Sequence, residues 1–201
     1  MDSPAADPIN QRIAARVRQL RADAGLSLDA LSAASGVSRS ALSLIERAES
    51  SPTAVVLDRI AVALGVPLAS LFDGPGSPAV ASPLARRADQ PLWRDPASGY
   101  LRRAVSPTGY PSPIQIVEVE FPPGASVAYE AALRDRTVHQ QLWVLQGCID
   151  FTVGALTYEL ARGDCLALQL DQPNRFHNPT RQTSRYAVVL VAEPAAAPSR
   201  R

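Results

Sequence analysis

Arginine and serine side chains gather at the start of one short, amphipathic segment of the chain. Arginine can donate two parallel hydrogen bonds to the acceptors on the major-groove edge of guanine, and serine hydroxyls can contact bases or phosphates. Apolar residues recur at helical spacing on the other side of this segment, at Leu42 and Ile45. The polar residues are therefore expected on its outer side, and they are Arg39, Ser40 and Ser43.

Two short helices joined by a tight turn are predicted to position these side chains. The first spans residues 28–35 and the second spans residues 39–48. Ser27 and Ser38 stand just ahead of them, where a hydroxyl can accept hydrogen bonds from free N–H groups of the first turn. Gly36 supplies the backbone freedom for the sharp turn between them. This is the pattern of a helix-turn-helix, whose second helix enters the major groove at its N-terminal end.

Residues 13–71 resemble the Xre-type, or lambda-repressor-like, DNA-binding domain. A small helical domain used for protein contacts is the alternative. The apolar pattern predicts five helices in this domain, over residues 9–24, 28–35, 39–48, 53–64 and 67–72. The motifs that carry the resemblance are Val17-Arg18-Gln19-Leu20-Arg21, Gly25-Leu26-Ser27, Gly36-Val37-Ser38, Leu42-Ser43, Ile45-Glu46-Arg47, Ser51-Pro52-Thr53 and Ala63-Leu64-Gly65-Val66.

The resemblance extends the set of candidate DNA contacts. Arg47 matches the family's arginine after Ile-Glu, and Arg16 or Arg18 falls where the domain start lies near the DNA backbone. A solvated helix face is the alternative for these two arginines. Three positions depart from the family: Leu28 replaces a DNA-contacting glutamine, Leu44 a polar residue and Ala48 a glycine. The full candidate set is Ser27, Ser38, Arg39, Ser40, Ser43, Arg47, Arg16 and Arg18.

The composition gives no sign of a polybasic tail or a membrane span. The formal net charge of the 201 residues is +1, and all 20 basic residues are arginine. The N-terminus lacks the basic start and apolar centre of a signal peptide, and no apolar run approaches spanning length. We therefore expect a cytoplasmic protein without a membrane partner, in which Cys148 and Cys165 are free thiols. A disulfide or redox switch between them is the alternative.

A change of composition after residue 72 marks a domain boundary. The following residues are rich in Pro, Gly, Ser and Ala, which is typical of a linker. The predicted organisation is a disordered N-terminus (1–8), a helix-turn-helix domain (9–72), a linker (73–90), a β-domain (91–194) and a tail (195–201).

Beyond the linker, apolar and polar residues alternate, and this pattern predicts strands. Short strands at regular spacing indicate a sandwich or a small barrel. The predicted fold class is therefore α+β multidomain, with an all-helical and an all-β part. The predicted strands span residues 114–121, 140–145, 149–153, 156–160, 165–170 and 186–192.

The turns of this region resemble those of the cupin barrel, a double-stranded β-helix. An Xre-type domain, a linker and a C-terminal cupin is a familiar layout of bacterial regulators, and cupin barrels commonly pair through their sheets. The resemblance therefore implies a homodimer held by the barrel. The matching motifs are Pro123-Gly124, Trp143-Val144-Leu145-Gln146-Gly147, Leu160-Ala161-Arg162-Gly163-Asp164 and the run from Pro173 to Asn178-Pro179.

The metal ligands of cupins are replaced in this chain. Metal-binding cupins use a His-x-His pair, a Glu and a later His, and these ligand types suit divalent transition metals. Counting along the motifs, Gln140 stands at the Glu position and Asn174 at the last His position. The His pair falls near Arg134 and Arg136. We therefore expect no metal and no other cofactor.

The two histidines of the chain, His139 and His177, are expected to point away from the barrel interior. Side chains alternate along a strand, so each histidine faces outward if its neighbours Gln140 and Asn178 face inward. A bulge could reverse this orientation, and the two histidines would then be the only imidazole candidates for a metal.

A polar barrel mouth remains, which could hold one small molecule. We expect it to sense an effector through hydrogen bonds rather than to catalyse a reaction. If Arg134 and Arg136 point inward, an anionic effector is favoured; otherwise both belong to a solvated loop. The candidate ligand-binding residues are Tyr129, Arg134, Arg136, Gln140, Leu142, Asn174, Phe176 and Asn178.

The leading functional hypothesis is a non-enzymatic transcriptional regulator that binds a palindromic operator in double-stranded DNA as a homodimer. The alternative is a metal-dependent cupin enzyme similar to the phosphonate epoxidases, which share this layout and hold one iron with two His and one Glu. Gln140 and Asn174 speak against that chemistry. An antitoxin or other protein-interaction module is the third possibility.

Overall fold

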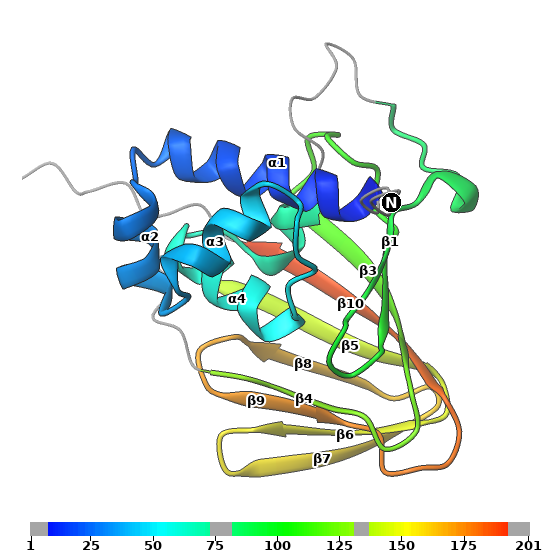
Figure 1. Cartoon of the computed structure of the whole chain (residues 1–201). Helices are drawn as coiled ribbons and strands as arrows, with labels where there is room; N and C mark the ends of the chain where they lie inside the picture. The colour runs from blue at the N-terminus through cyan, green and yellow to red at the C-terminus, as the bar shows by residue number, and fades with distance from the viewer. Residues whose placement is uncertain (1–7, 73–81, 131–136, 193–201) are drawn as a thin grey trace, which may run out of the picture.

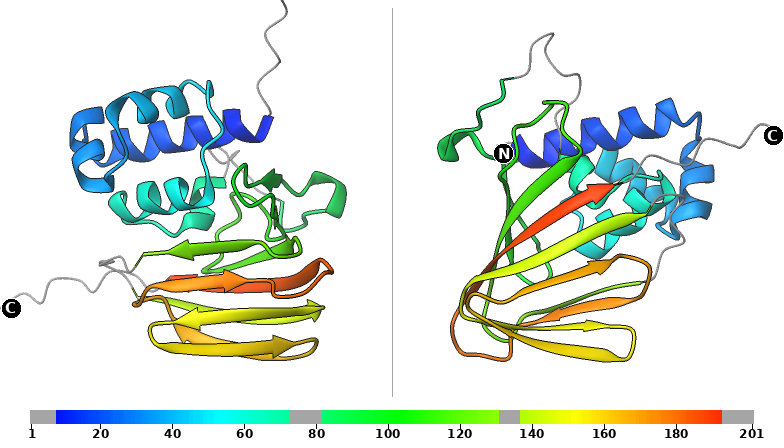
Figure 2. Two further views of the ribbon diagram at one scale, coloured as in Figure 1. Left: turned by 60° about the horizontal axis from the view of Figure 1, so that its bottom comes forward. Right: turned by 180° about the vertical axis from the view of Figure 1, so that it is seen from behind.

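The protein folds into a helical domain that lies against one side of a β-domain (Figures 1 and 2). This computed structural model describes residues 8–72, 82–130 and 137–192. Hydrogen-bonded α-helices occupy most of the first range, and antiparallel strands occupy most of the other two. The α-helices are α1 (Pro8–Asp23), α2 (Leu28–Ser35), α3 (Arg39–Glu46) and α4 (Ala54–Ala63).

The described part of the helical domain contains four α-helices, whereas the sequence predicts five. The predicted fifth helix is η1 (Leu68–Phe72), a 3₁₀ helix of 5 residues. Such short segments commonly take the tighter 3₁₀ form. The helix count is corrected to four, and η1 still contributes Leu71 and Phe72 to the core.

Local side chains fix where the helices begin. The hydroxyl groups of Ser27, Ser38 and Thr53 accept hydrogen bonds from backbone N–H groups of the first turns of α2, α3 and α4. Gly36 follows α2 with a φ of 66°, a left-handed conformation that glycine adopts without strain. These caps place the turn between α2 and α3 where the sequence predicts it.

α3 ends at Glu46, two residues before its predicted end. Ala48 N–H donates to the Ile45 carbonyl (3.0 Å) and Glu49 N–H donates to the Leu44 carbonyl (2.9 Å). This is the hydrogen-bond pattern of a Schellman motif, which closes a helix through a residue with positive φ. Ala48 is that residue, with a φ of 58°. Ala48 stands where the resembled family has glycine, and its positive φ ends the helix.

The β-domain consists of two antiparallel sheets. The six-stranded sheet has the order β1-β2-β3-β10-β5-β8, and the four-stranded sheet has the order β4-β9-β6-β7. The strands of the first sheet are β1 (Leu92–Arg94), β2 (Leu101–Ala104), β3 (Ile114–Phe121), β10 (Ser184–Ala192), β5 (Val138–Gln146) and β8 (Cys165–Gln169). Those of the second are β4 (Ser126–Tyr129), β9 (Asn174–His177), β6 (Cys148–Val153) and β7 (Leu156–Ala161).

The four strands that the sequence does not predict are the shortest of the ten, with 3 residues in β1 and 4 in each of β2, β4 and β9. So few residues show too little alternation to be recognised. β5 shows the expected alternation clearly: Val138, Gln140, Leu142 and Val144 are buried, whereas Trp143 is exposed. Gln140 is thus a polar residue in an otherwise apolar inner row.

The two domains contact each other directly. Asp95 Oδ1, in the β-domain, accepts a hydrogen bond from Ala54 N–H at the start of α4 (2.9 Å, buried). Phe72 of η1 packs edge-on against Trp93 with ring centroids 5.4 Å apart, and the Arg102 guanidinium lies 4.1 Å from the Phe72 ring centroid. The helical domain is therefore docked by apolar and hydrogen-bonded contacts as well as by the chain connection.

The predicted linker falls partly in the described chain. Its residues 73–81 lie outside the described residues, and its last part contains a 3₁₀ turn, η2 (Arg87–Asp89). None of the helices in the described ranges combines the length and the apolar character needed to cross a bilayer.

Candidate functional site

The start of α3 presents an exposed polar surface. Ser38, Arg39 and Ser40 are all exposed, and the Ser38 hydroxyl both caps the helix and lies 3.2 Å from the Ser40 hydroxyl. Arg39 Nε lies 3.1 Å from Asp29 Oδ1, and both side chains are more than half exposed. An ion pair this exposed contributes little stability, so Arg39 can exchange Asp29 for another acceptor at small cost.

Arg47 lies just after α3 and is held by a local network. Its guanidinium donates two hydrogen bonds to the Glu49 carboxylate (2.9 Å each) and one to the Ser43 hydroxyl (2.8 Å). The hydrogen bond and charge of Arg47 lower the pKa of Glu49. Ser43 and Arg47 therefore face each other on the surface, beside a carboxylate that would repel phosphate.

Arg16 and Arg18 make contacts within the helical domain. Arg16 Nε donates to the Ser70 carbonyl (3.1 Å), which ties α1 to η1, and Arg18 Nη2 donates to the Glu46 carbonyl. Ser27 accepts a hydrogen bond from Ala30 N–H and caps α2. These three residues thus have structural roles in the free protein, and contact of either arginine with phosphate stays a prediction.

A buried ion pair that the sequence analysis does not identify holds α3 against α1. Arg21 donates two hydrogen bonds to the Glu46 carboxylate, at 2.6 and 2.9 Å, and a third to the Leu26 carbonyl (2.8 Å). The hydrogen bonds that Arg21 donates to the Glu46 carboxylate raise the pKa of Arg21. Since Leu42 and Ile45 are buried on the same helix, α3 is held by its inner face while its polar face stays exposed.

The second candidate site is a cavity of about 100 Å³ in the β-domain, at the contact with the helical domain. Four of the candidate ligand-binding residues, Tyr129, Gln140, Asn174 and Phe176, line it, and their contact with a ligand stays a prediction. The predicted Arg134 and Arg136 lie outside the described residues. Most of the remaining wall is apolar and comes from β3, β5 and β10, through Val117, Val119, Phe121, Val138, Tyr186, Val188 and Leu190.

Leu142 and Asn178 do not line the cavity, contrary to the prediction. Both are fully buried. Asn178 Nδ2 donates to the carbonyls of Phe121 (3.0 Å) and Gln182 (2.8 Å), while its Oδ1 accepts two hydrogen bonds from Thr180. With every polar atom of its amide occupied, Asn178 organises the turn before β10. Leu142 packs in the apolar core.

The polar groups of the cavity are uncharged amides and phenols, together with one carboxylate and one guanidinium. The hydroxyls of Tyr100 and Tyr129 lie 3.4 Å apart. Gln140 is 6% exposed, and its Nε2 has no hydrogen-bond partner in the described part of the chain. Asp58 of α4 and Arg102 of β2 also line the cavity. The arrangement can bind a small molecule that accepts a hydrogen bond.

Burial keeps the phenols of this region in their neutral form. It raises the pKa of Tyr100 to about 12 and raises the pKa values of Tyr129 and Tyr186 well above 10. The physical cause is desolvation, which disfavours the phenolate in an apolar surrounding.

These tyrosines are expected to make the protein less stable in alkali. A pKa raised from 10.0 to about 12 means that the folded state binds the proton more tightly. The stabilisation is complete below pH 10 and is lost as the pH rises toward 12, by about 2 kcal/mol at pH 12 for Tyr100 alone. Urea unfolding at pH 8, 10 and 11 should show this fall, with a smaller slope in Tyr100→Phe. A slope unchanged by that substitution would contradict the assignment.

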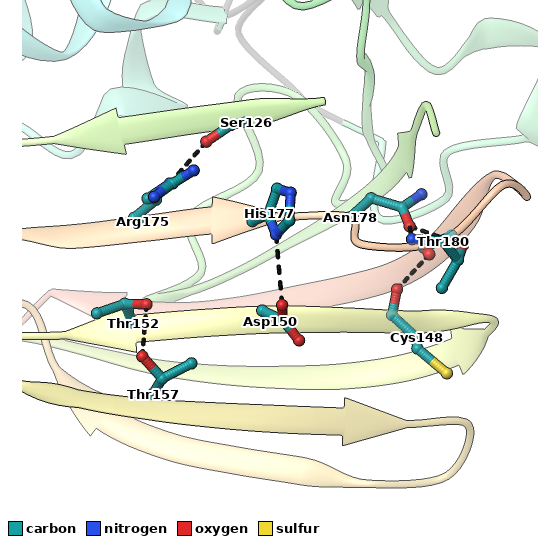
Figure 3. Close-up of polar contacts among 10 residues, drawn as sticks. Ser126, Cys148, Asp150, Thr152, Thr157, Arg175, His177, Asn178 and Thr180 are labelled. Atoms are coloured by element: carbon teal, nitrogen blue, oxygen red, sulfur yellow. Dashed lines mark hydrogen bonds and ion pairs between the residues drawn. The ribbon is translucent and has the colours of Figure 1, made fainter. Parts of the chain in front are cut away.

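The two histidines lie away from the cavity. His177 Nδ1 is 3.3 Å from Asp150 Oδ2 on the outer face of the four-stranded sheet, next to the Arg175–Ser126 and Thr152–Thr157 cross-strand pairs (Figure 3). His139 precedes the cavity-lining Gln140 on β5. Among the residues that the structure describes, no three His, Cys, Asp or Glu side chains come together in a metal-binding group.

Comparison with known proteins assigns the region that contains the first site to a domain family. The helix-turn-helix family model HTH_3 matches residues 17–71, which include α2 and α3. Residues 17–71 form an HTH_3 domain. The HTH-type transcriptional regulator SutR of Escherichia coli K12 is 46% identical over 61 residues, which cover 30% of this chain and 34% of SutR. The match to this curated relative therefore spans about a third of its length.

The whole chain has the fold of a solved regulator. An HTH_3 family transcriptional regulator from Vibrio cholerae superposes with a TM-score of 0.72 at 24% identity, covering 92% of this chain and 97% of the other. The chain thus combines the HTH_3 match over residues 17–71 with a C-terminal domain of two antiparallel sheets. Hydroxypropylphosphonic acid epoxidase from S. wedmorenis is a more distant match, with a TM-score of 0.46 and 16% identity over 90% of this chain and 97% of its own. That likeness is too weak to support an inference about chemistry.

Proposed function

We propose that this protein is a cytoplasmic, sequence-specific transcriptional regulator whose α3 reads DNA in the major groove. The observation that carries the proposal is the exposed Ser38, Arg39 and Ser40 surface at the N-terminal end of α3, within an HTH_3 domain. In helix-turn-helix proteins this end of the second helix contacts base edges. Arg39 would supply the bidentate contact to guanine, and the serines would contact bases or phosphates.

The packing of α3 suits this role. Leu42 and Ile45 anchor the helix from within, and the Arg21–Glu46 pair fixes its last turn. A recognition helix held in this way presents its side chains in one geometry, which lowers the cost of ordering them on DNA. Arg47 lies at the opposite end of the helix from Arg39 and, once released from Glu49, would contact a phosphate.

We further propose that the protein binds its operator as a homodimer held by the β-domain. The outer face of the six-stranded sheet carries aligned apolar side chains: Ile116 pairs with Val189, and Ile114 pairs with Val191. Trp143 on the neighbouring strand β5 is 50% exposed. Exposed large apolar side chains on one face of a sheet favour an interface, and a second copy would bring two recognition helices to two half-sites.

The cavity is proposed to hold a small effector that alters operator affinity. Gln140 and Asn174 line it with amide groups where metal-binding cupins have a carboxylate and an imidazole. Amides are poor ligands for transition metals, so this lining favours recognition through hydrogen bonds over metal-dependent oxidation. To change operator affinity, the effector must bind the two states of the protein with different affinities.

Selection from random duplex DNA tests the proposed function. The purified full chain is expected to recover a palindrome whose half-sites lie about one helical turn apart, with about 10 base pairs between their centres. Binding of the selected duplex should exceed that of a scrambled duplex at every salt concentration, because only the non-specific part depends on phosphates alone. A sequence-indifferent affinity would refute sequence-specific regulation, and a single unrepeated half-site would refute the dimer.

A further inference from the structure

The wall of the cavity is shared between the two domains. Asp58 of α4, together with Pro67, Leu68 and Ala69 in and before η1, closes one side, and the β-domain supplies the rest. Ala69 is 7% exposed and Asp58 is 6% exposed, so this side is part of the packed interior. A molecule in the cavity would touch the DNA-binding domain as well as the barrel.

The volume of the cavity limits the size of its ligand. It measures about 100 Å³. An engineered apolar cavity of about 150 Å³ accommodates benzene, so a molecule held wholly within this one has no more than about six heavy atoms. The walls are largely apolar, with Val117, Val188 and Phe176 among them. A short branched or linear carbon skeleton fits this description.

One unsatisfied donor sets the polarity of the ligand. Gln140 Nε2 is buried in the cavity wall without a hydrogen-bond partner in the described chain. Leaving such a donor unpaired costs about 1–3 kcal/mol, so a ligand that offers an oxygen acceptor recovers this cost. Tyr100 and Tyr129 contribute hydroxyl groups to the same wall, 3.4 Å from each other.

The charges of the wall disfavour an anion. Asp58 brings a carboxylate from α4 and Arg102 brings a guanidinium from β2, so the charges of the pair cancel. Without a net positive charge in the wall, a ligand carboxylate would lose its hydration in a largely apolar space and gain no compensating attraction. A neutral carbonyl or amide avoids this cost.

We infer that the cavity is an interdomain site for a small, neutral molecule with a carbonyl-type acceptor, and that its occupancy stabilises the docking of the HTH_3 domain on the barrel. This inference rests on the proposed effector function and specifies its ligand class and its route of coupling. Docking already depends on the Asp95–Ala54 hydrogen bond and on the Phe72–Trp93 contact. A ligand that touches both sides of the same interface adds to these contacts and thereby fixes the orientation of α3 relative to the barrel.

Thermal unfolding of the full chain with two matched probes tests the ligand class. Isobutyramide and isobutyrate share one carbon skeleton and differ in charge. At ten times its Kd, isobutyramide is expected to raise the Tm by about 3–6 °C. Isobutyrate should leave the Tm unchanged. Gln140→Met, which removes the donor while keeping the volume, should abolish the response to isobutyramide. An equal response to isobutyrate, no response to isobutyramide, or an undiminished response in Gln140→Met would overturn the ligand class.

Filling the cavity from the helical side tests its interdomain character. Ala69→Leu, and the smaller Ala69→Val, should weaken the isobutyramide response in that order while leaving the far-ultraviolet circular dichroism unchanged. Ala128→Leu is the matched control, because Ala128 is exposed on β4. If Ala69→Leu does not fold, Ala69→Val alone decides the test. A full response in the folded Ala69 variant would show that the helical domain does not form the wall.

Hydrogen exchange of a backbone amide at the domain contact measures the docking of the helical domain on the β-domain. The Ala54 N–H donates to Asp95 across the domain contact, so its exchange reports undocking. Isobutyramide is expected to slow exchange of this amide by about tenfold at ten times its Kd. Protection confined to barrel amides would overturn the coupling. Neither readout involves DNA, so a failed operator selection and a failed ligand test can be told apart.

Discussion

Replacing Glu46 with alanine is expected to lower the free energy of unfolding of the helical domain by about 3–5 kcal/mol, measured by urea denaturation. The Glu46 side chain is 8% exposed and accepts two hydrogen bonds from Arg21, whose side chain is 19% exposed. The substitution leaves the Arg21 guanidinium partly buried without its counter-charge, which costs more than the pair itself contributes. The last turn of α3 would also lose its attachment to α1.

The chain contains its own control for this prediction. Arg47 and Glu49 form the same two-hydrogen-bond arrangement on the surface, where both side chains are about half exposed. Glu49→Ala should therefore lower stability by no more than about 1 kcal/mol. The double substitution Arg21→Met with Glu46→Leu should recover much of the loss caused by Glu46→Ala, since it removes both charges together. Equal effects of Glu46→Ala and Glu49→Ala would refute the role assigned to burial.

Replacing Arg39 with alanine is expected to weaken binding to the selected operator by about ten- to a hundredfold. A bidentate arginine–guanine contact contributes about 1–3 kcal/mol of discrimination, or about 5- to 150-fold, and the expected loss lies within this range. The affinity for scrambled DNA should change much less, because Arg39 is expected to read a base and not only a phosphate. Fluorescence anisotropy titrations of both duplexes at two salt concentrations measure the two affinities.

Arg175→Ala is the matched control for the operator prediction. Arg175 is also an exposed arginine, but it lies on β9 of the barrel and donates to the Ser126 hydroxyl (2.8 Å; Figure 3). The two substitutions change the net charge equally, so a difference between them isolates the place of the charge. If both reduce affinity for operator and scrambled DNA by the same factor, Arg39 does not read a base.

Much of the helical domain could be predicted from the sequence because its signals are local. A capping serine, an apolar stripe and a turn glycine lie within a few residues of each other, so Ser38 and Gly36 reveal the start of α3 without knowledge of the rest of the chain. The end of α3 was less evident. Alanine as a residue type does not indicate a positive φ at position 48, and the only hint is that the resembled family has glycine there.

The cavity in the β-domain could be predicted only in part. Alternation along a strand places Gln140 on the inner face, and the cavity position follows from that register. Asn178 satisfies the same alternation, but its amide binds the backbone of Phe121 and Gln182 and so belongs to a turn. A hydrogen bond between residues 57 positions apart leaves no pattern in the sequence that would reveal it.

The sequence by itself determined the kinds of domain in this protein. It shows a capped helix-turn-helix, a change from helical to alternating spacing of apolar residues after the linker, and a β-domain that lacks the ligands of metal-binding cupins. Each of these features can be recognised from the types of residues that lie close together in the sequence. The tertiary structure alone decided how the parts are joined. The Arg21–Glu46 pair, the Asp95–Ala54 hydrogen bond and the placement of Asp58 in the cavity wall join residues far apart in the chain. Their energies depend on burial and on distances of a few ångströms, which arise only when both domains have folded and packed together.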